Sequence, residues 1–158
     1  MKMRIEYHDK FHEEPLKAML ALEKYVHACG LEPKLIELVK MRASQINGCA
    51  YWLDMHSKDA RALGETEQRL YALNAWRETP FYSERERAAL EWTEAVTLVA
   101  ETHVPDEIYE QARKHFSEKE LLDLTFAVVV INSWNRLAVS LRAVPGTYQA
   151  KRTFAAAS

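Results

Sequence analysis

The stretch Asn47 to His56, NGCAYWLDMH, decides the fold of this 158-residue chain. Asn-Gly is a turn dipeptide, and the residues that follow it return to helical spacing until Gly64. The turn therefore separates two predicted helices, over 33–46 and 49–63, and Cys49 opens the second of them.

Apolar spacing and capping signals predict further helices on both sides of this pair. Ser83 and Ser117 each begin a Ser-x-x-Glu capping box ahead of an apolar series, and Pro15 and Pro105 suit first helical turns. The additional helices are predicted at 15–29, 66–74, from 84 onwards, 105–116 and 118–141. Residues 127–131 have strand-like composition, but the cap before them favours a helix. We expect one all-α domain over 1–158 with about six to seven helices.

The bulk composition excludes several classes of protein. Lys and Arg total 21 against 23 Asp and Glu, and without a long basic block we expect no nucleic-acid partner. Two cysteines make no disulfide framework, and the N-terminus lacks a signal-like apolar stretch, which favours the cytoplasm. The apolar run 121–131 is shorter than the roughly 18 residues of a membrane span, so we expect a buried core helix.

The chain beyond the last predicted helix carries no clear pattern. Pro145-Gly146 ends the apolar periodicity, and the tail from Thr147 to Ser158 shows none of its own. We expect this tail to be loosely ordered or docked on a partner subunit.

The chemistry-bearing residues gather at the central turn. A cysteine at a helix N-terminus meets unpaired backbone N–H groups, which favour the nucleophilic thiolate, so Cys49 is a candidate redox residue. Cys49, Trp52 and His56 stand at i, i+3 and i+7 and share one helix face. Cys49 and His56 are separated by about 10.5 Å of axial rise, beyond direct hydrogen-bond reach, and position 52 is adjacent to both.

Each of these residues also has a purely structural interpretation. Cys49 could be a small buried hydrophobe, and Glu37 a solvated residue of its helix. For Trp52 we favour a packing role, although its bulk could also close a pocket. Among the remaining polar residues, three near the motif are interpreted as an exposed helix face: Asp54, Lys58 and Asp59. Glu23 and His27 are interpreted as an ordinary i, i+4 pair.

The spacing Glu37-x11-Cys49-x2-Trp52-x3-His56 resembles the motif of the AhpD-like alkylhydroperoxidase and carboxymuconolactone decarboxylase family. That motif is a Glu followed twelve residues later by Cys-x-x-Cys-x-x-x-His. The phrase from Asp54 to Ala60 is typical of short single-domain members, and the resemblance extends over residues 67–76, 84–96 and 132–136. Trp134-Asn135-Arg136 could line the pocket or pair across a subunit contact.

The resemblance implies an all-helical fold and a hydroperoxide reductase, with Cys49, His56 and Glu37 as catalytic residues. It also implies an external thiol or lipoylated-protein reductant, no bound metal or cofactor, and a homo-oligomer, commonly a trimer or hexamer. In the family the second cysteine attacks the hydroperoxide, helped by the Glu and His, and the first cysteine resolves it. Trp52 takes the place of that attacking thiol, so the two-cysteine cycle cannot run.

Several functions therefore remain open at the level of the sequence. Cys49 could act as a lone peroxidatic cysteine that is reduced by an external thiol or resolved by Cys29. The chain could instead perform lactone decarboxylation or related acid-base chemistry, in which Glu37 and His56 matter most. A third alternative is a non-catalytic oligomeric binding or scaffolding protein in which Cys49 is inert.

Overall fold

The computed structural model describes residues 2–6 and 13–150, and within these ranges every regular element is a helix. The predicted all-α fold is confirmed. The elements are α1 (Glu13–Ala28), α2 (Pro33–Ile46), α3 (Ala50–Ala62), α4 (Glu67–Tyr71), the 3₁₀ helix η2 (Leu73–Glu78), α5 (Glu84–Thr97), α6 (Val99–Thr102), α7 (Asp106–Arg113) and α8 (Glu118–Leu141).

The described part of the chain holds more helices than the six to seven predicted, because two short segments had no signal of their own. The segment predicted as one helix over 66–74 divides into α4 and η2 around Ala72. Helix α6 ends where His103 and Val104 both adopt positive φ without a glycine. Both predicted capping boxes are confirmed, with Ser83 and Ser117 accepting from the backbone N–H three residues later.

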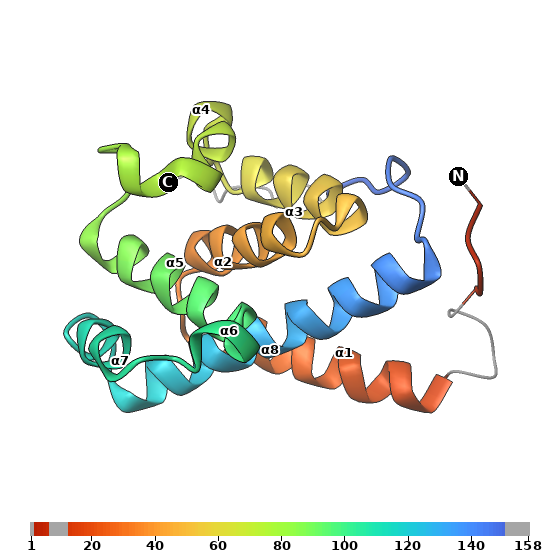
Figure 1. Cartoon of the computed structure of the whole chain (residues 1–158). Helices are drawn as coiled ribbons and strands as arrows, with labels where there is room; N and C mark the ends of the chain where they lie inside the picture. Colours follow the sequence, from red (N-terminus) through yellow and green to blue (C-terminus); the bar gives the residue numbers. More distant parts are fainter. Residues whose placement is uncertain (1, 7–12, 151–158) are drawn as a thin grey trace.

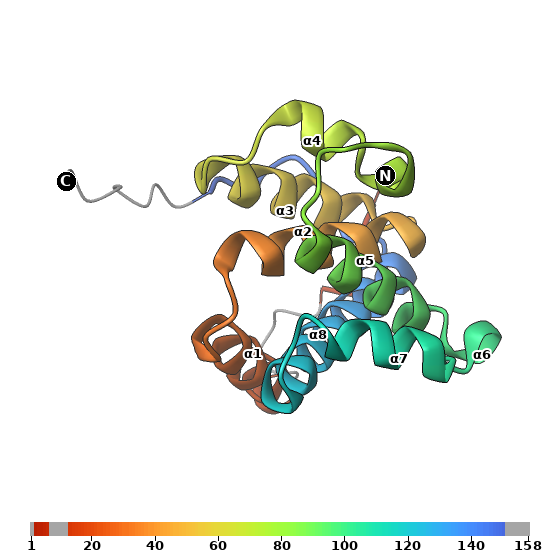
Figure 2. The ribbon, with the colours of Figure 1, turned by 90° about the vertical axis from the view of Figure 1, so that its left-hand side faces the viewer.

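Helix α2 lies at the centre of the molecule, in contact with α3, α5 and α8. Figures 1 and 2 show α3 and α4 on one side of it, and α1, α7 and α8 on the other. Nine of the ten residues of α2 from Leu35 to Ser44 are buried, all except Arg42, and they include the charged side chains of Glu37 and Lys40. A helix that is buried on nearly all sides can carry such groups only if partners from other helices satisfy them.

Helix α8 is long and apolar enough to cross a membrane by length and composition, with a mean hydropathy of 1.4 over the relevant window. Half of that window is buried inside the protein, where α8 packs against α1, α2 and α5. This is the environment of a core helix, as the run 121–131 predicts.

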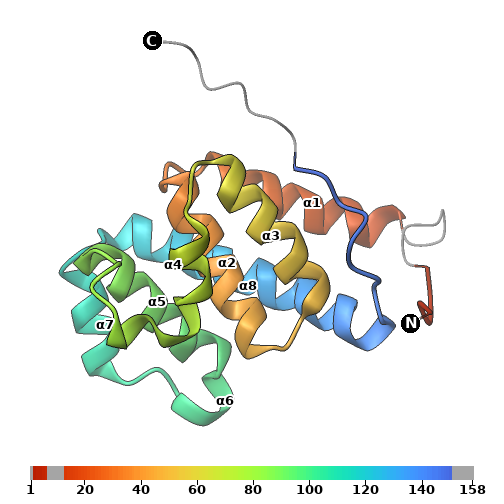
Figure 3. The same cartoon turned by 90° about the horizontal axis from the view of Figure 1, so that it is seen from above.

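The chain after α8 lies across α3 of the same molecule (Figure 3). The backbone N–H of Gly146 donates to the Asp54 carboxylate at 3.1 Å, and the Lys58 ammonium donates to the Tyr148 carbonyl at 3.0 Å. Tyr148, in the tail predicted to be loosely ordered or docked on a partner subunit, is thus held by the polar face of α3 of the same molecule. Residues 151–158 lie outside the described part of the chain.

Candidate functional site

Glu37 of α2 and His56 of α3 form a buried pair. Nδ1 of the His56 ring lies 2.8 Å from Oε2 of Glu37, and the two residues are only 3% and 4% exposed. The interpretation of Glu37 as a solvated residue is wrong, because close packing of α2 on α3 covers it. A carboxylate bonded to one ring nitrogen fixes the orientation of the ring.

The second ring nitrogen of His56, Nε2, has no hydrogen-bond partner and is fully buried in the described structure. Buried polar atoms in proteins are almost always paired, so an unpaired one calls for a functional explanation. With Nδ1 held by Glu37, Nε2 is the atom through which His56 can exchange a proton with another molecule.

A cavity of about 200 Å³ lies beside this pair. Half of the residues that line it have aromatic or apolar side chains, and the other half have acid or imidazole groups. The lining residues are Leu20, Glu23, His27, Glu37, Tyr51, Trp52, Met55, His56, Asp59 and Trp134. Trp134, predicted to line a pocket or a subunit contact, therefore lines this cavity.

The side chain of Trp52 lies between His56 and Cys49. Its indole stacks on the His56 ring, with ring centroids 5.3 Å apart and planes 21° from parallel, and it lies 5.6 Å from Trp134. It also packs against the small apolar cluster that contains Cys49. Trp52 thus has the packing role that the sequence favoured, in the position that separates the two candidate groups.

Cys49 is completely buried and is absent from the cavity wall. It is the N-cap of α3, after a turn in which Gly48 takes a φ of +62°, and it packs against Met3, Ala138 and Ala143. Burial raises the pKa of the Cys49 thiol, and the backbone N–H groups of Trp52 and Tyr51 lower it by less. The expectation of a thiolate is wrong, because desolvation outweighs the field of the helix N-terminus.

The two cysteines belong to different parts of the core. Cys29, at the end of α1, is half-buried, and its thiol donates to the Val26 carbonyl at 3.0 Å. It packs on the large cluster between α1, α2 and α8, whereas Cys49 belongs to the small cluster with Ala138 and Ala143. The structure therefore does not support Cys29 as a resolving thiol for Cys49.

A second ion pair, between the buried Lys40 and the partly exposed Glu23, lies next to the cavity, and sequence reasoning missed it. The ammonium of Lys40, which is 0% exposed, donates to Glu23 Oε1, and His27 Nε2 is 3.0 Å from the same oxygen. The indole N–H of Trp134 donates to the other Glu23 oxygen at 3.2 Å. The His27 ring and the Lys40 ammonium together hold the pKa of Glu23 at about 2, against the opposing effect of burial.

This pair predicts a specific loss of stability in acid. The folded protein keeps Glu23 ionised down to about pH 2, whereas the unfolded chain protonates it near 4.5. The contribution of ionised Glu23 to the free energy of unfolding is therefore present above about pH 4.5 and is lost as the pH falls towards 2. Its upper limit is about 3 kcal/mol. We expect Glu23→Gln to be less stable than the wild type at pH 7 and to show a shallower acid limb in denaturant titrations between pH 5 and 2. Parallel acid limbs in the two proteins would contradict this.

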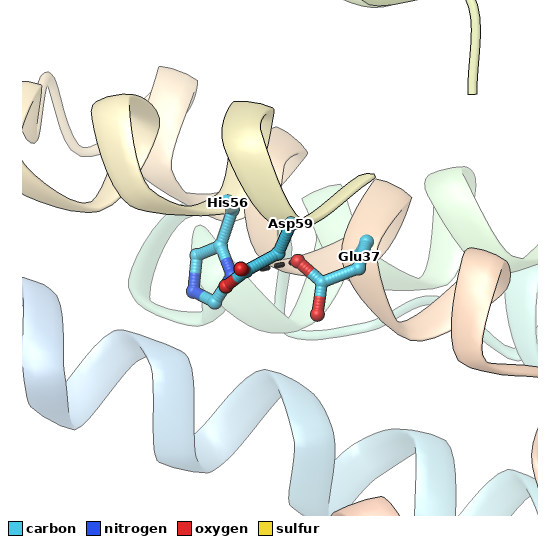
Figure 4. Close-up of side chains that lie close together, drawn as sticks. All are labelled: Glu37, His56 and Asp59. Atoms are coloured by element: carbon cyan, nitrogen blue, oxygen red, sulfur yellow. Dashed lines mark hydrogen bonds and ion pairs between the residues drawn. The ribbon is translucent and has the colours of Figure 1, made fainter. Parts of the chain in front are cut away.

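Asp59 joins the Glu37 and His56 pair from the same helix as the histidine. Each of the three residues offers one ligand atom, and these atoms lie within 4.8 Å of one another (Figure 4), so these are the residues that could hold a divalent cation. The hydroxyl of Tyr148 donates to Asp59 Oδ1 at 2.7 Å. Asp59 is thus not an ordinary exposed residue, and its i+3 spacing from His56 is the signal that could have revealed it.

Comparisons with known proteins give the family of the chain. Residues 13–95 match the model of the carboxymuconolactone decarboxylase family. The uncharacterized protein YdfG of Bacillus subtilis is 45% identical over 141 residues, which cover 89% of this chain and 95% of YdfG. The chain belongs to the carboxymuconolactone decarboxylase family. The family assignment made from Glu37, Cys49 and His56 is confirmed.

Solved structures extend the assignment. An Agrobacterium tumefaciens protein of unknown function, named as an antioxidant defence protein of the AhpD type, is 48% identical with a TM-score of 0.89, over 93% of this chain and all of that one. The debrominase Bmp8, at 21% identity and a TM-score of 0.76 over 85% of this chain and 74% of its own, shares the fold. The carboxymuconolactone decarboxylase fold thus carries different chemistries, and function has to be argued from the site.

Proposed function

We propose that this protein is an acid-base enzyme of the carboxymuconolactone decarboxylase family, which acts on a small apolar or aromatic molecule and does not use a thiol. One observation carries the proposal. The Glu37 and His56 pair is intact and borders a cavity with Nε2 unpaired, while Cys49 is fully buried outside that cavity.

The geometry supports a defined division of roles. Nε2 of His56 would accept a proton from a carbon or oxygen acid in the cavity and later return it. Glu37, bonded to Nδ1, would hold the ring in the orientation that directs Nε2 outward and would stabilise the imidazolium that forms. Tyr51, Trp52 and Trp134 would hold the apolar part of the substrate and exclude water.

The test is proton transfer to small carbon acids. Lactones, carboxymuconolactone among them, and related carbonyl compounds are incubated with the protein in D₂O, and proton NMR follows deuterium incorporation and turnover. We expect activity that Cys49→Ser retains and His56→Gln loses. Loss of the activity in Cys49→Ser would overturn the proposal.

Thiol-dependent hydroperoxide reduction is the second candidate, favoured by the 48% identity with the AhpD-type protein of Agrobacterium. Cys49 would attack the hydroperoxide and release the alcohol, and an external thiol or lipoylated protein would reduce the resulting sulfenic acid and release water. This requires Met3 and the end of α8 to move away from Cys49. Trapping of a Cys49 sulfenic acid in the native protein would favour this candidate, and inactivity in both assays would favour the binding or scaffolding role.

We further propose that the chain forms a cytoplasmic homo-oligomer, a trimer or hexamer. Three apolar residues of α8, Leu122, Val129 and Val139, are 43–56% exposed in the single chain, and an association would cover them. Both cysteines of the chain are free, as is usual where thiols are kept reduced. Light scattering after size exclusion gives the mass of the assembly, and a Val129→Glu variant should lower it.

A further inference from the structure

Three atoms of the kinds that bind divalent metals come together between α2 and α3. Glu37 supplies a carboxylate oxygen from α2, and His56 and Asp59 supply a ring nitrogen and a carboxylate oxygen from α3. All three atoms lie within 4.8 Å of one another, and Figure 4 shows the side chains converging from the two helices. Ligand atoms that bind one cation at about 2.0 to 2.2 Å lie roughly 3 to 4 Å apart. Small rotations of these side chains would therefore bring all three atoms onto one ion.

Each of the two carboxylates keeps one oxygen available. Glu37 uses Oε2 for Nδ1 of His56, and Asp59 uses Oδ1 to accept the hydrogen bond of the Tyr148 hydroxyl at 2.7 Å. No hydrogen bond within the described part of the chain reaches Glu37 Oε1 or Asp59 Oδ2. Both residues border the inner cavity of about 200 Å³ and also a second cavity of about 320 Å³. These cavities give an ion and its water ligands a route to the carboxylates.

The walls of the two cavities carry an excess of acidic groups. Glu23, Glu37 and Asp59 contribute three carboxylates, and the described residues that line the cavities include no lysine or arginine. The nearby ammonium of Lys40 donates to Glu23, so its charge is used there. Glu37 and Asp59 are left to share one imidazole, that of His56. Buried carboxylates need a partner charge or a metal, and one divalent cation would balance both of them.

We propose that Glu37, His56 and Asp59 form a binding site for one divalent transition-metal cation such as Zn²⁺. An imidazole together with two carboxylates favours ions of this class over Mg²⁺, which prefers oxygen ligands alone. Three protein ligands leave coordination positions for water or for a small molecule from the cavities. The Tyr148 hydroxyl orients the Asp59 carboxylate without touching the ion, as hydrogen bonds to metal-binding carboxylates commonly do.

The cation and the proposed acid-base pair use the same atoms. Nδ1 is the ring nitrogen of His56 that faces Glu37, so an ion bound there takes the place of the hydrogen bond between them. The metal-bound form and the proton-transferring form of the site are therefore alternatives. The binding site itself does not rest on the proposed acid-base function, because the ion binds whether or not carbon acids are substrates.

Calorimetric titration of the full-length protein with Zn²⁺, at neutral pH and after removal of metals by a chelator, tests the site. We expect one Zn²⁺ to bind per chain even in a large excess of Mg²⁺. Asp59→Asn should weaken the binding by about 10-fold or more, and Tyr148→Phe by about 10-fold through loss of the hydrogen bond to Asp59. Nitrogen-15 NMR of the wild type locates the ion, because the resonance of His56 Nδ1 should shift when Zn²⁺ binds.

Asp123 and Tyr25 provide matched controls for these two variants. Asp123 is a buried carboxylate of α8 that accepts from the Tyr25 hydroxyl at 2.6 Å, and neither residue lines the two cavities. Asp123→Asn and Tyr25→Phe should therefore leave the affinity for Zn²⁺ unchanged.

The possible results separate the site from the proposed function. Absence of Zn²⁺ binding, equal affinity in the wild type and Asp59→Asn, or binding that leaves the His56 Nδ1 resonance in place overturns the proposal. The last of these measurements needs only the wild type, so it decides the question even if Asp59→Asn does not fold. Binding of Zn²⁺ as expected, without turnover of carbon acids by the metal-free protein, would count against the acid-base function alone.

Discussion

Trp52→Cys is expected to create hydroperoxide reductase activity that the wild type lacks. The new thiol would lie one helical turn from Cys49 and beside the Glu37 and His56 pair. The substitution thereby completes the family motif. With a dithiol reductant, consumption of tert-butyl hydroperoxide should rise by about 10²-fold or more, since a positioned base and an activated thiol contribute at least that much. Loss of the indole should also lower the free energy of unfolding by about 2 to 4 kcal/mol.

A matched control distinguishes the effect of a thiol at position 52 from the effect of adding any thiol to the cavity. Met55 lines the same cavity, and Met55→Cys introduces a thiol there that has no cysteine three residues before it. We expect this variant to consume hydroperoxide no faster than the wild type. If Trp52→Cys folds and remains as inactive as Met55→Cys, the motif spacing does not by itself encode the thiol chemistry.

Glu37→Gln is expected to lower the turnover of a carbon acid substrate strongly. The amide can still accept the hydrogen bond from Nδ1, but it cannot stabilise the imidazolium, so the rate should fall by about 10³-fold. His56→Gln should reduce it to the background rate. The measurement is initial rate by NMR under identical conditions.

Glu94→Gln provides the matched control for this change. Glu94 is another largely buried carboxylate, bonded to Arg42, Trp76 and Arg77 away from the cavity. Its substitution should lower stability while leaving the rate of turnover near that of the wild type. Equal losses of rate in both variants would mean that damage to the fold, not removal of the acid-base pair, explains the effect of Glu37→Gln.

Much of the fold could be predicted from local sequence signals. The Ser83 and Ser117 capping boxes begin α5 and α8 where expected, and the Asn47-Gly48 turn separates α2 from α3. These devices act within one turn of the backbone, so the sequence contains them completely. The break after α6 was not predictable, because positive φ at His103 and Val104 carries no glycine signal.

The candidate site could be predicted only in part. Glu37 and His56 were found through their spacing in a motif, and the structure brings them together. Lys40 was missed because lysine is rarely buried, and only the tertiary contact with Glu23 makes its burial tolerable. Tyr148 was missed because its partner is 89 residues away, a relation that no local pattern contains. The prediction of a thiolate at Cys49 was wrong because the position of a residue at the start of a helix does not reveal how deeply the residue is buried.

Paired rates for Cys49→Ser and His56→Gln on one carbon acid substrate test the central claim most directly. The account predicts that Cys49→Ser retains nearly the wild-type rate, while His56→Gln loses all of it. A protein in which Cys49→Ser abolishes turnover and His56→Gln preserves it would contradict the assignment of this site to acid-base chemistry.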